Sequence, residues 1–437
     1  MNSFFGPQDC FDYLIERNPE LFFEVILITF RIPFSCMISL AEIKEAEIRI
    51  SQHIIHTPLV YSPTISQITG AKVYLKLETL QKSGSFKVRG ATNKILSHID
   101  TIREQGVIAA SAGNHAQGVA VAAHSAGIPA TIVMPEWSSI SKQEATRGYG
   151  AQVIIHGQTL EESILRAQQI ASQGRLFIHP YDDEEVIAGQ GTIGLEILAD
   201  LPETDMIIIP VGGGGLIAGI ATAVKAKKPE IRIIGVQTEA CPSVGEAIRH
   251  GSPYRIPVRE TIADGIRVAE TGKNTLPVIQ HYVDHLALAS EDEIADAMLL
   301  LLERKHVVAE GAGAVPLATL LNGSIDVQSG STVVLVISGG NIESAQLFRV
   351  IRQSLARKGR TMHFSVILDD QPGSLARLLA VIAKERGNIL HIYHMLGESD
   401  LPVQMARVSL ELETRGWEHI EAFKKRLAEN GYEIHMG

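Results

Sequence analysis

Two uninterrupted apolar runs, each followed at once by glycines, constrain the fold of this chain more than any other feature. Residues 206–211 read MIIIPV and precede the tetraglycine 212–215. Residues 332–337 read TVVLVI and precede SGGN at 338–341. A strand that is apolar on both faces is typical of a parallel sheet covered by helices on both sides. The two runs therefore predict an α/β fold.

Shorter apolar runs alternate with helical patterns through most of the chain. Strands are predicted at 71–78, 106–111, 129–135 and 152–157. Helices are predicted at 86–99, 114–127 and 160–174. A helix around Lys142 and Arg147 is expected to expose both side chains. A helical stretch at 291–310 leads into a further helix that ends at Leu321. Strands separated by helices imply crossover connections and therefore parallel sheets.

The pattern changes near residue 360, after a basic segment that reads RKGR. The predicted order from there is strand 362–368, helix 374–386, strands 389–396 and 403–412, helix 416–430 and strand 432–436. This βαββαβ order is typical of a ferredoxin-like unit. We therefore expect a large domain of two α/β subdomains at 37–360 and a small domain at 361–437.

Composition and charge exclude several classes of protein. The net charge of -10 argues against nucleic acid or an anionic membrane as the main partner. The three cysteines, Cys10, Cys36 and Cys241, form no CxxC pair, which predicts a reducing, cytoplasmic location without disulfides or a zinc site. The apolar stretch at 21–30 is shorter than the roughly 20 residues of a membrane span. We interpret residues 1–36 as an extension, without a catalytic role, upstream of a natural start at Met37.

Lys87 is the first candidate functional residue. It lies in SGSFKVRG at 83–90, where a strand and a turn give way to a predicted helix. A helix N-terminus places positive potential beside the amine, which lowers its pKa. A lowered pKa suits a lysine that forms an imine. An ordinary lysine at the start of a helix is the alternative.

A second loop, SAGNHAQG at 111–118, also follows a predicted strand and opens a predicted helix. Backbone N–H groups at such a helix start can hold a carboxylate. A turn capped by Ser111 or Asn114 explains the same residues. The side chain of His115, taken alone, favours a packed or exposed histidine over a catalytic one.

The glycine loops after the two apolar runs complete the set. Four successive glycines at 212–215 let backbone amides converge on a phosphate at a helix start, although a purely structural turn is the alternative. The loop at 338–341 can place the hydroxyl of Ser338 in a crevice at the carboxyl end of the sheet.

In this order, SFKVRGA, SAGNHAQG, PVGGGGL and SGGN resemble the fold-type-II pyridoxal-phosphate enzymes, and within them the threonine and serine dehydratases. The resemblance extends from about Ile38 to Arg360. Beyond it, LDDQPGSLARLLAVIAKERGNI resembles an ACT domain, a class that binds amino acids and regulates metabolic enzymes. The resemblance implies a tryptophan-synthase-β-like catalytic domain with pyridoxal 5'-phosphate. It also implies conversion of L-threonine to 2-oxobutanoate and ammonia, use of L-serine, and a homo-oligomer, either tetramer or dimer.

The resemblance also implies roles for individual residues. Lys87 would join the cofactor as an imine, and its freed amine would take the Cα proton of the substrate. Cofactor contacts would come from Phe86, Lys87, Asn114 at the phenolic oxygen, Gly212, Gly213, Gly214, Gly215 and Leu216 at the phosphate, and Ser338 at the pyridine nitrogen. The substrate carboxylate would lie against backbone amides of Ser111, Ala112, Gly113, Asn114 and His115.

An amino-acid effector, with isoleucine or valine as candidates, would bind at Asp370, Gly373, Ser374, Asn388 and Ile389. Packing between subunits is the alternative role of this small domain. The sequence leaves open whether the reaction serves isoleucine synthesis or threonine breakdown.

Two positions distinguish this chain from relatives. Serine racemases carry a serine at the position of Ala112, where it acts as a second base, so we expect no efficient racemisation. Gln237 stands where metal-dependent relatives have glutamate, so we predict no divalent site, while a monovalent cation held by carbonyls stays open. A β-replacing synthase of the same fold, and an amino-acid sensor in which only the C-terminal unit functions, are the rival interpretations.

Overall fold

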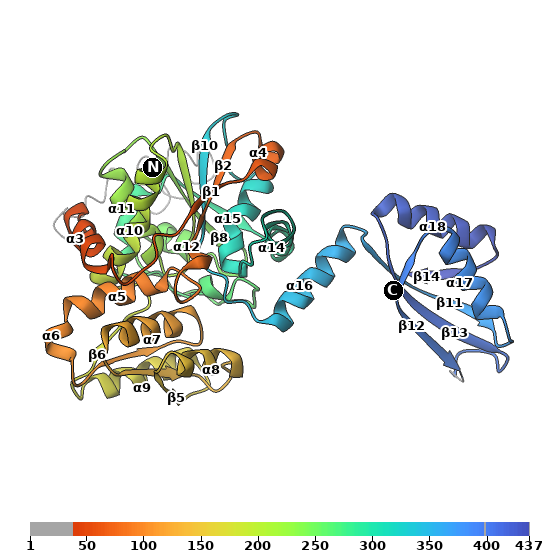
Figure 1. Ribbon diagram of the computed structural model, residues 1–437, viewed down its shortest axis with the longest axis horizontal. Helices are drawn as coiled ribbons and strands as arrows, with labels where there is room; N and C mark the ends of the chain where they lie inside the picture. The colour runs from red at the N-terminus through yellow and green to blue at the C-terminus, as the bar shows by residue number, and fades with distance from the viewer. Residues whose placement is uncertain (1–37, 397–398, 437) are drawn as a thin grey trace, which may run out of the picture. The chain divides into compact units, whose positions relative to one another are not determined.

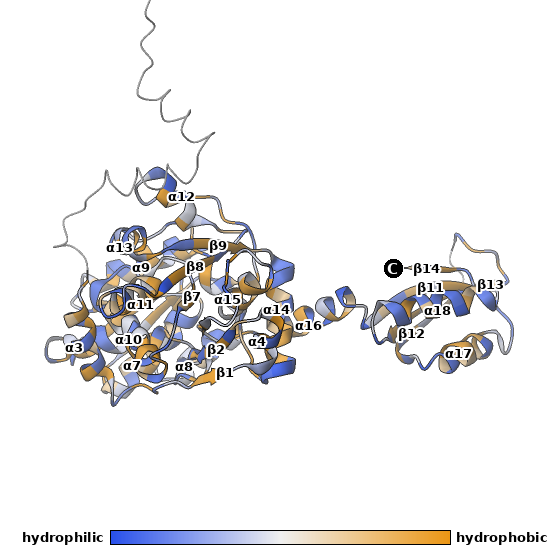
Figure 2. Ribbon diagram, turned by 90° about the horizontal axis from the view of Figure 1, so that it is seen from above, coloured by the Kyte–Doolittle hydropathy of each residue, from blue (hydrophilic) through white to orange (hydrophobic). Residues whose placement is uncertain are grey.

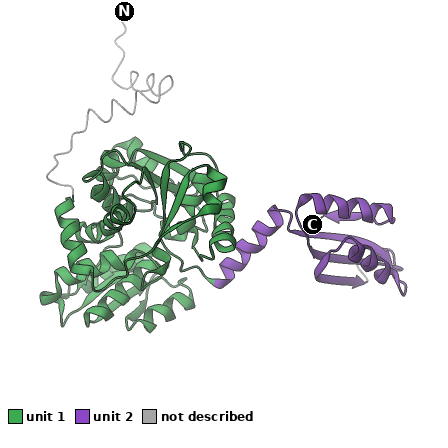
Figure 3. Cartoon of the chain, turned by 45° about the horizontal axis from the view of Figure 1, so that its top comes forward, with its two compact units in different colours: residues 1–343 green, residues 344–437 purple. Residues whose placement is uncertain are grey.

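The computed structural model describes residues 38–396 and 399–436. The N-terminal extension proposed at 1–36 lies outside the described residues. Contacts divide the chain into two compact units, 1–343 and 344–437 (Figure 3). The helix α16 (Ser344–Arg357) counts with the second unit, although we placed the end of the large domain at residue 360.

The larger sheet of the first unit contains both apolar runs. Its strand order is β1 (Leu59–Tyr61), β2 (Lys72–Leu77), β10 (Thr332–Ile337), β7 (Met206–Pro210), β8 (Arg232–Thr238) and β9 (His285–Ala289) (Figure 1). Every neighbouring pair is parallel except β1 with β2. β7 and β10 are buried along their whole length, as their sequence predicts, and apolar residues concentrate in the strands of this unit (Figure 2).

A second, smaller sheet forms from the chain between β2 and β7. Its order is β5 (Gln152–Ile155), β4 (Ala130–Met134), β3 (Val107–Ala110) and β6 (Leu176–Phe177), and all its pairs are parallel. The first unit is therefore built on one parallel sheet and one sheet that is parallel except for its edge strand β1, and the predicted α/β fold class is confirmed.

Helices connect and cover these strands. They are α3 (Leu40–Ile50), α4 (Pro63–Thr69), η2 (Glu78–Leu80), α5 (Lys87–Ser97), α6 (Ile99–Ile102), α7 (Asn114–Ala126), α8 (Ile140–Gly148), α9 (Leu160–Ala171), α10 (Glu184–Asp200), α11 (Gly215–Lys225), α12 (Ser243–His250), η3 (Asp264–Ile266), α13 (Thr275–Tyr282), α14 (Glu291–Lys305) and α15 (Gly311–Leu321). The helical stretch expected to reach residue 310 ends at Lys305, because His306 adopts a left-handed φ of 56°.

The long helix α10 was not predicted, because glycines interrupt its helical pattern. Those glycines lie where other backbones approach closely. A Cβ at Gly189 would lie 2.6 Å from the Cα of Gly90, and one at Gly191 would lie 2.9 Å from the carbonyl oxygen of Gly219. The close packing of α10 against α5 and α11 therefore explains residues that weaken an isolated helix.

The second unit has the predicted ferredoxin-like order. Its elements after α16 are β11 (Thr361–Asp369), α17 (Ser374–Lys384), β12 (Asn388–Leu396), β13 (Met405–Glu413), α18 (Trp417–Glu429) and β14 (Ile434–Met436). The sheet is antiparallel, in the order β12-β13-β11-β14. Burial alternates along β11 and β13, so one sheet face packs against α17 and α18.

Two kinds of feature are absent from residues 38–396 and 399–436. None of their helices combines the length and the apolar character that a bilayer span needs. In the same ranges, no three His, Cys, Asp or Glu side chains gather closely enough to hold a metal ion.

Candidate active site

One crevice of the first unit is lined by residues from all four loops that the sequence singled out. It encloses about 550 Å³, including open space at its mouth. The predicted residues that line it are Phe86, Lys87, Asn114, Gly212, Gly213, Gly214, Gly215, Leu216 and Ser338. Each loop follows the carboxyl end of a parallel strand: β2, β7 and β10 in the larger sheet, and β3 in the smaller one. Loops of both sheets therefore line the crevice.

Lys87 begins α5 and extends its amine into this crevice. Its Nζ donates a hydrogen bond to the carbonyl oxygen of Pro180 at 2.8 Å and lies 5.2 Å from the centre of the Phe86 ring. Burial lowers the pKa of Lys87 to about 8, although the carboxylate of Glu310 acts in the opposite direction. About a tenth of this amine is therefore neutral at pH 7, far more than for an ordinary lysine.

The tetraglycine forms a bare backbone cradle between β7 and α11. Gly214 has a φ of 99°, which favours glycine. A Cβ at Gly213 would lie 2.4 Å from the Tyr181 ring, and one at Gly215 would lie 2.7 Å from the Tyr181 carbonyl oxygen. The first N–H groups of α11 have no acceptor within the helix, and the helix dipole favours an anion there. The cradle therefore fits the phosphate of the implied cofactor.

Asn114, the first residue of α7, is held by two side chains. Its Nδ2 donates to Oε1 of Glu310 at 2.6 Å, and its Oδ1 accepts from Nδ2 of Asn341 at 2.9 Å. Asn341 also donates to the Ser83 carbonyl oxygen at 2.8 Å. These bonds link the second and fourth loops to the loop that carries Lys87.

Glu310 is the main functional candidate that the sequence analysis missed. It is buried at the start of α15 and lines the crevice. Burial and the neighbouring Asp264 raise the pKa of Glu310 to about 7, while hydrogen bonding from Asn114 opposes that shift. A lone glutamate in VVAEGAGA, next to small residues at a helix start, was the available signal.

Residues 111–115 lie at the start of α7, where the Ser111 N–H already donates to the Val133 carbonyl oxygen at 3.1 Å. Gly113 is the N-cap and no side chain caps the helix, so a turn capped by Ser111 or Asn114 does not explain this loop. Ser111 instead accepts from the Gly113 N–H at 3.1 Å. The ring of His115 is buried against the Ile178 carbonyl oxygen at 2.9 Å, and burial lowers its pKa to about 3, so it is neutral.

The expectation that Lys142 is exposed is wrong. Its Nζ forms an ion pair with Oδ2 of Asp264 at 2.9 Å, and only 17% of its side chain is exposed. Asp264 begins η3, which contributes Gly265 and Ile266 to the crevice. The ion pair joins α8 to a wall of the site, a contact that sequence pattern alone does not reveal. Arg147 is exposed, as expected.

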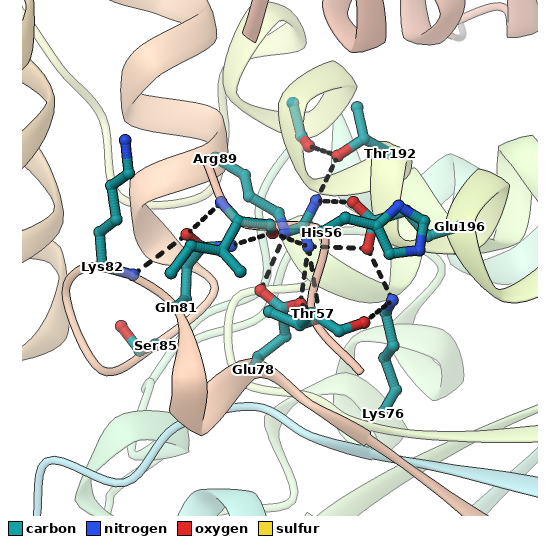
Figure 4. Close-up of polar contacts among 12 residues, drawn as sticks. His56, Thr57, Lys76, Glu78, Gln81, Lys82, Ser85, Arg89, Thr192 and Glu196 are labelled. Atoms are coloured by element: carbon teal, nitrogen blue, oxygen red, sulfur yellow. Dashed lines mark hydrogen bonds and ion pairs between the residues drawn. The ribbon is translucent and has the colours of Figure 1, made fainter. Parts of the chain in front are cut away.

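A buried ion network lies two residues beyond Lys87 on the same helix (Figure 4). Nε of Arg89 donates to Oε2 of Glu78 at 2.9 Å, and Nη1 donates to Oε1 of Glu196 at 2.6 Å. Lys76 pairs with the other oxygen of Glu196 at 2.6 Å and donates to the Thr57 carbonyl oxygen at 2.6 Å. The network ties the start of α5 to β2, η2 and α10, and thereby fixes the helix that carries Lys87.

The chain is similar to known pyridoxal-phosphate-dependent proteins. A family model described as pyridoxal-phosphate dependent enzyme matches residues 50–339. An L-threonine ammonia-lyase from Thermotoga maritima is 47% identical over 402 residues, covering 92% of this chain and 100% of the relative. A catabolic L-threonine dehydratase from Staphylococcus aureus is 49% identical over 323 residues, covering 73% of this chain and 93% of the relative.

Solved structures of related enzymes share the fold of most of this chain. The processed form of threonine deaminase isoform 2 from Solanum lycopersicum superposes with a TM-score of 0.68 at 34% identity, covering 72% of this chain and 94% of that one. Maize serine racemase superposes with a TM-score of 0.69 at 35% identity, covering 73% of this chain and 98% of that one.

Proposed function

This chain belongs to the pyridoxal-phosphate-dependent enzymes, as a relative of the L-threonine ammonia-lyases, and we propose that it converts L-threonine to 2-oxobutanoate and ammonia. The observation that carries the proposal is the single crevice in which Lys87, Asn114, Ser338 and the glycine cradle meet. L-serine, which would give pyruvate, is the proposed second substrate.

Each group in the crevice has a task in this proposal. Lys87 would hold the cofactor through its aldehyde, the N–H groups of 212–216 would hold its phosphate, and Asn114 and Ser338 would contact its ring. When bound, the cofactor supplies an electron sink for negative charge at the substrate Cα.

Lys87 also acts as the base. Its lowered pKa provides the neutral amine that can take a proton from the substrate Cα. Within 111–115, the backbone N–H groups other than those of Ser111 and Gly113, which donate within the protein, would bind and orient the substrate carboxylate.

The deciding experiment measures keto-acid release by the cofactor-loaded protein from L-threonine and from L-serine, with D-serine measured in parallel. We expect 2-oxobutanoate and pyruvate, with little D-serine because the methyl group of Ala112 cannot transfer a proton. Product that forms only when a second nucleophile is added would favour a β-replacing synthase. D-serine formed as fast as pyruvate would contradict the role given to Ala112.

The charge of Glu310 is expected to set the pH range in which Lys87 reacts. Ionised Glu310 favours the protonated amine, so Glu310→Gln removes that effect and lowers the pKa of Lys87. We expect the apoprotein to attach the cofactor about two- to tenfold faster at pH 7. The midpoint of the rate against pH, followed by visible absorbance, should move to lower pH.

The neighbours of Glu310 and a matched variant make this measurement specific. Asp264, Lys142, Asn114 and Lys87 surround the carboxylate and stay unchanged in the variant. Glu144 is exposed on α8, so Glu144→Gln makes the same charge change away from the crevice and should leave the midpoint in place. A midpoint that stays constant or rises in Glu310→Gln would rule out the proposed effect.

We further propose that the second unit binds an amino-acid effector and acts as an ACT domain. A cavity of about 650 Å³, including open space, is lined by Leu368, Asp369, Asp370, Gln371, Pro372, Gly373, Ser374, Leu375 and His394. Three of the five expected effector residues line it. The other two do not, since Asn388 donates to Glu413 at 3.2 Å and Ile389 packs on the core. His394 was not expected there.

Isoleucine or valine is expected to release heat on binding and to change the rate of keto-acid release. Loss of one polar contact in His394→Ala should weaken the effector about three- to tenfold. His391 is exposed on the same strand and does not line the cavity, so His391→Ala is the matched control. If neither amino acid gives heat or alters the rate, packing between subunits becomes the better account of this unit.

The location, the oligomeric state and the metabolic role of the enzyme are also proposed. We propose a cytoplasmic homo-oligomer, tetramer or dimer, that serves isoleucine synthesis or threonine breakdown. Cys241, the one cysteine in the described ranges, is a free thiol buried in the first unit, which supports a reducing compartment. Light scattering of the holoenzyme gives the number of subunits.

A further inference from the structure

Gln237 is a buried glutamine on β8 whose amide is fully occupied by backbone groups. It is 1% exposed. Its Nε2 donates to the carbonyl oxygens of Val211 at 3.3 Å and Cys241 at 3.4 Å. Its Oε1 accepts from the N–H groups of Val244 at 3.2 Å and Gly245 at 3.4 Å.

These four partners permit only one orientation of the amide. Carbonyl oxygens can only accept and backbone N–H groups can only donate, so the nitrogen must face Val211 and Cys241. The oxygen then faces the first turn of α12, where the N-cap Pro242 offers no side-chain acceptor. The oxygen of Gln237 thus serves as the cap that this helix lacks.

The contact with Val211 connects this amide to the cofactor site. Val211 is the last residue before Gly212, so its carbonyl group lies at the foot of the cradle that is proposed to hold the phosphate. Cys241 and α12 belong to the segment that follows β8. Gln237 therefore fixes the start of the glycine loop against a neighbouring strand and helix.

Two backbone carbonyl oxygens that point toward the same position can also act as ligands of a hard cation. Here an amide NH₂ group, with its partial positive charge, lies at that point. A carboxylate at position 237 would bring a third acceptor against these two oxygens in a buried place. Such a carboxylate would need a cation or a proton to be tolerated.

We propose that Gln237 takes the place of a bound cation at the foot of the glycine loop, so that the cofactor is retained without a metal ion. This inference goes beyond the proposed reaction, because it concerns how the loop is fixed and holds for any substrate. Gln237 is a positioning residue in this account, since it acts through Val211 and does not touch the cofactor.

The first test uses the natural holoenzyme. Activity, visible absorbance of the bound cofactor and Tm are measured in tetramethylammonium buffer with a chelator, and again after adding K⁺, Na⁺, Mg²⁺ or Ca²⁺. All three are expected to change little, with activity constant within about twofold. A gain of about tenfold in activity or cofactor affinity, or a clear rise in Tm with one of these cations, would overturn the proposal.

The second test introduces the carboxylate. Without cations, Gln237→Glu is expected to bind the cofactor at least about tenfold more weakly and to have a lower Tm. One of the added cations should restore both, because it can bridge the carboxylate and the two carbonyl oxygens. Gln173 is exposed after α9, so Gln173→Glu carries the same charge change and should show no cation effect. If no added cation changes the cofactor affinity or the Tm of Gln237→Glu, the inference is contradicted.

A neutral variant separates lost hydrogen bonds from a missing cation. Gln237→Met removes all four contacts and adds no charge, so its cofactor affinity should fall and no cation should restore it. Unchanged cofactor affinity in this variant would show that Gln237 does not position the loop. These readouts use cofactor binding and Tm, so they decide the inference even if L-threonine is not the substrate.

Discussion

Replacing Lys87 with alanine is expected to reduce keto-acid release from L-threonine by at least about a thousandfold. Two tasks are lost together, because the same amine binds the cofactor and takes the substrate proton. Bound cofactor that remains in the crevice should also differ in visible absorbance. Borohydride treatment should leave no cofactor covalently attached to the variant.

Lys82 provides the matched control for this substitution. It lies on the same loop and is exposed, and no hydrogen bond of its amine is drawn among the polar contacts of this region (Figure 4). Lys82→Ala removes an amine at nearly the same place and should keep activity within about twofold. If Lys87→Ala loses only a few-fold in activity, or still fixes the cofactor on reduction, the central role of Lys87 is disproved.

Most of the site residues could be placed from sequence because they directly follow predicted strands. Lys87, Asn114, the glycines and Ser338 each lie in a loop after a parallel strand. The carboxyl ends of β2, β7 and β10 share one edge of the larger sheet, which brings three of the loops together. The strand before Asn114, β3, belongs to the smaller sheet, so the place of that loop came from the family resemblance and not from sheet topology. The βαββαβ order of the second unit was likewise readable, because its strands alternate between buried and exposed positions.

Residues whose role depends on a distant partner could not be placed. Glu310 acquires its raised pKa from burial and from Asp264, and Lys142 is half-buried because Asp264 pairs with it. Gln237 was noticed only as a difference from relatives, whereas its contacts come from two backbone segments, at Val211 and at 241–245. A linear pattern gives the residue and the element, but not which polar groups the fold brings within reach.

Replacing Arg89 with methionine is expected to lower the free energy of unfolding of the first unit by about 3–5 kcal/mol. Glu78 is completely buried and Glu196 nearly so, and both pair with the Arg89 guanidinium. Without the guanidinium, both carboxylates would stay buried without that partner. The free-energy cost of a buried unpaired charge exceeds the stabilisation that the ion pair itself contributes. The unfolding of this unit can be followed by Trp137 fluorescence in a Trp417→Phe background, since the chain has two tryptophans.

Charge, rather than lost packing, is the proposed cause, and a second substitution distinguishes the two. Glu78→Gln added to Arg89→Met removes one stranded carboxylate, while Glu196 keeps its ion pair with Lys76. The double variant should therefore recover at least about 1 kcal/mol over Arg89→Met. Arg103 is exposed near α6, and Arg103→Met should change stability by no more than about 0.5 kcal/mol. A double variant less stable than Arg89→Met would show that packing around the guanidinium, and not the unpaired carboxylates, holds the start of α5 in place.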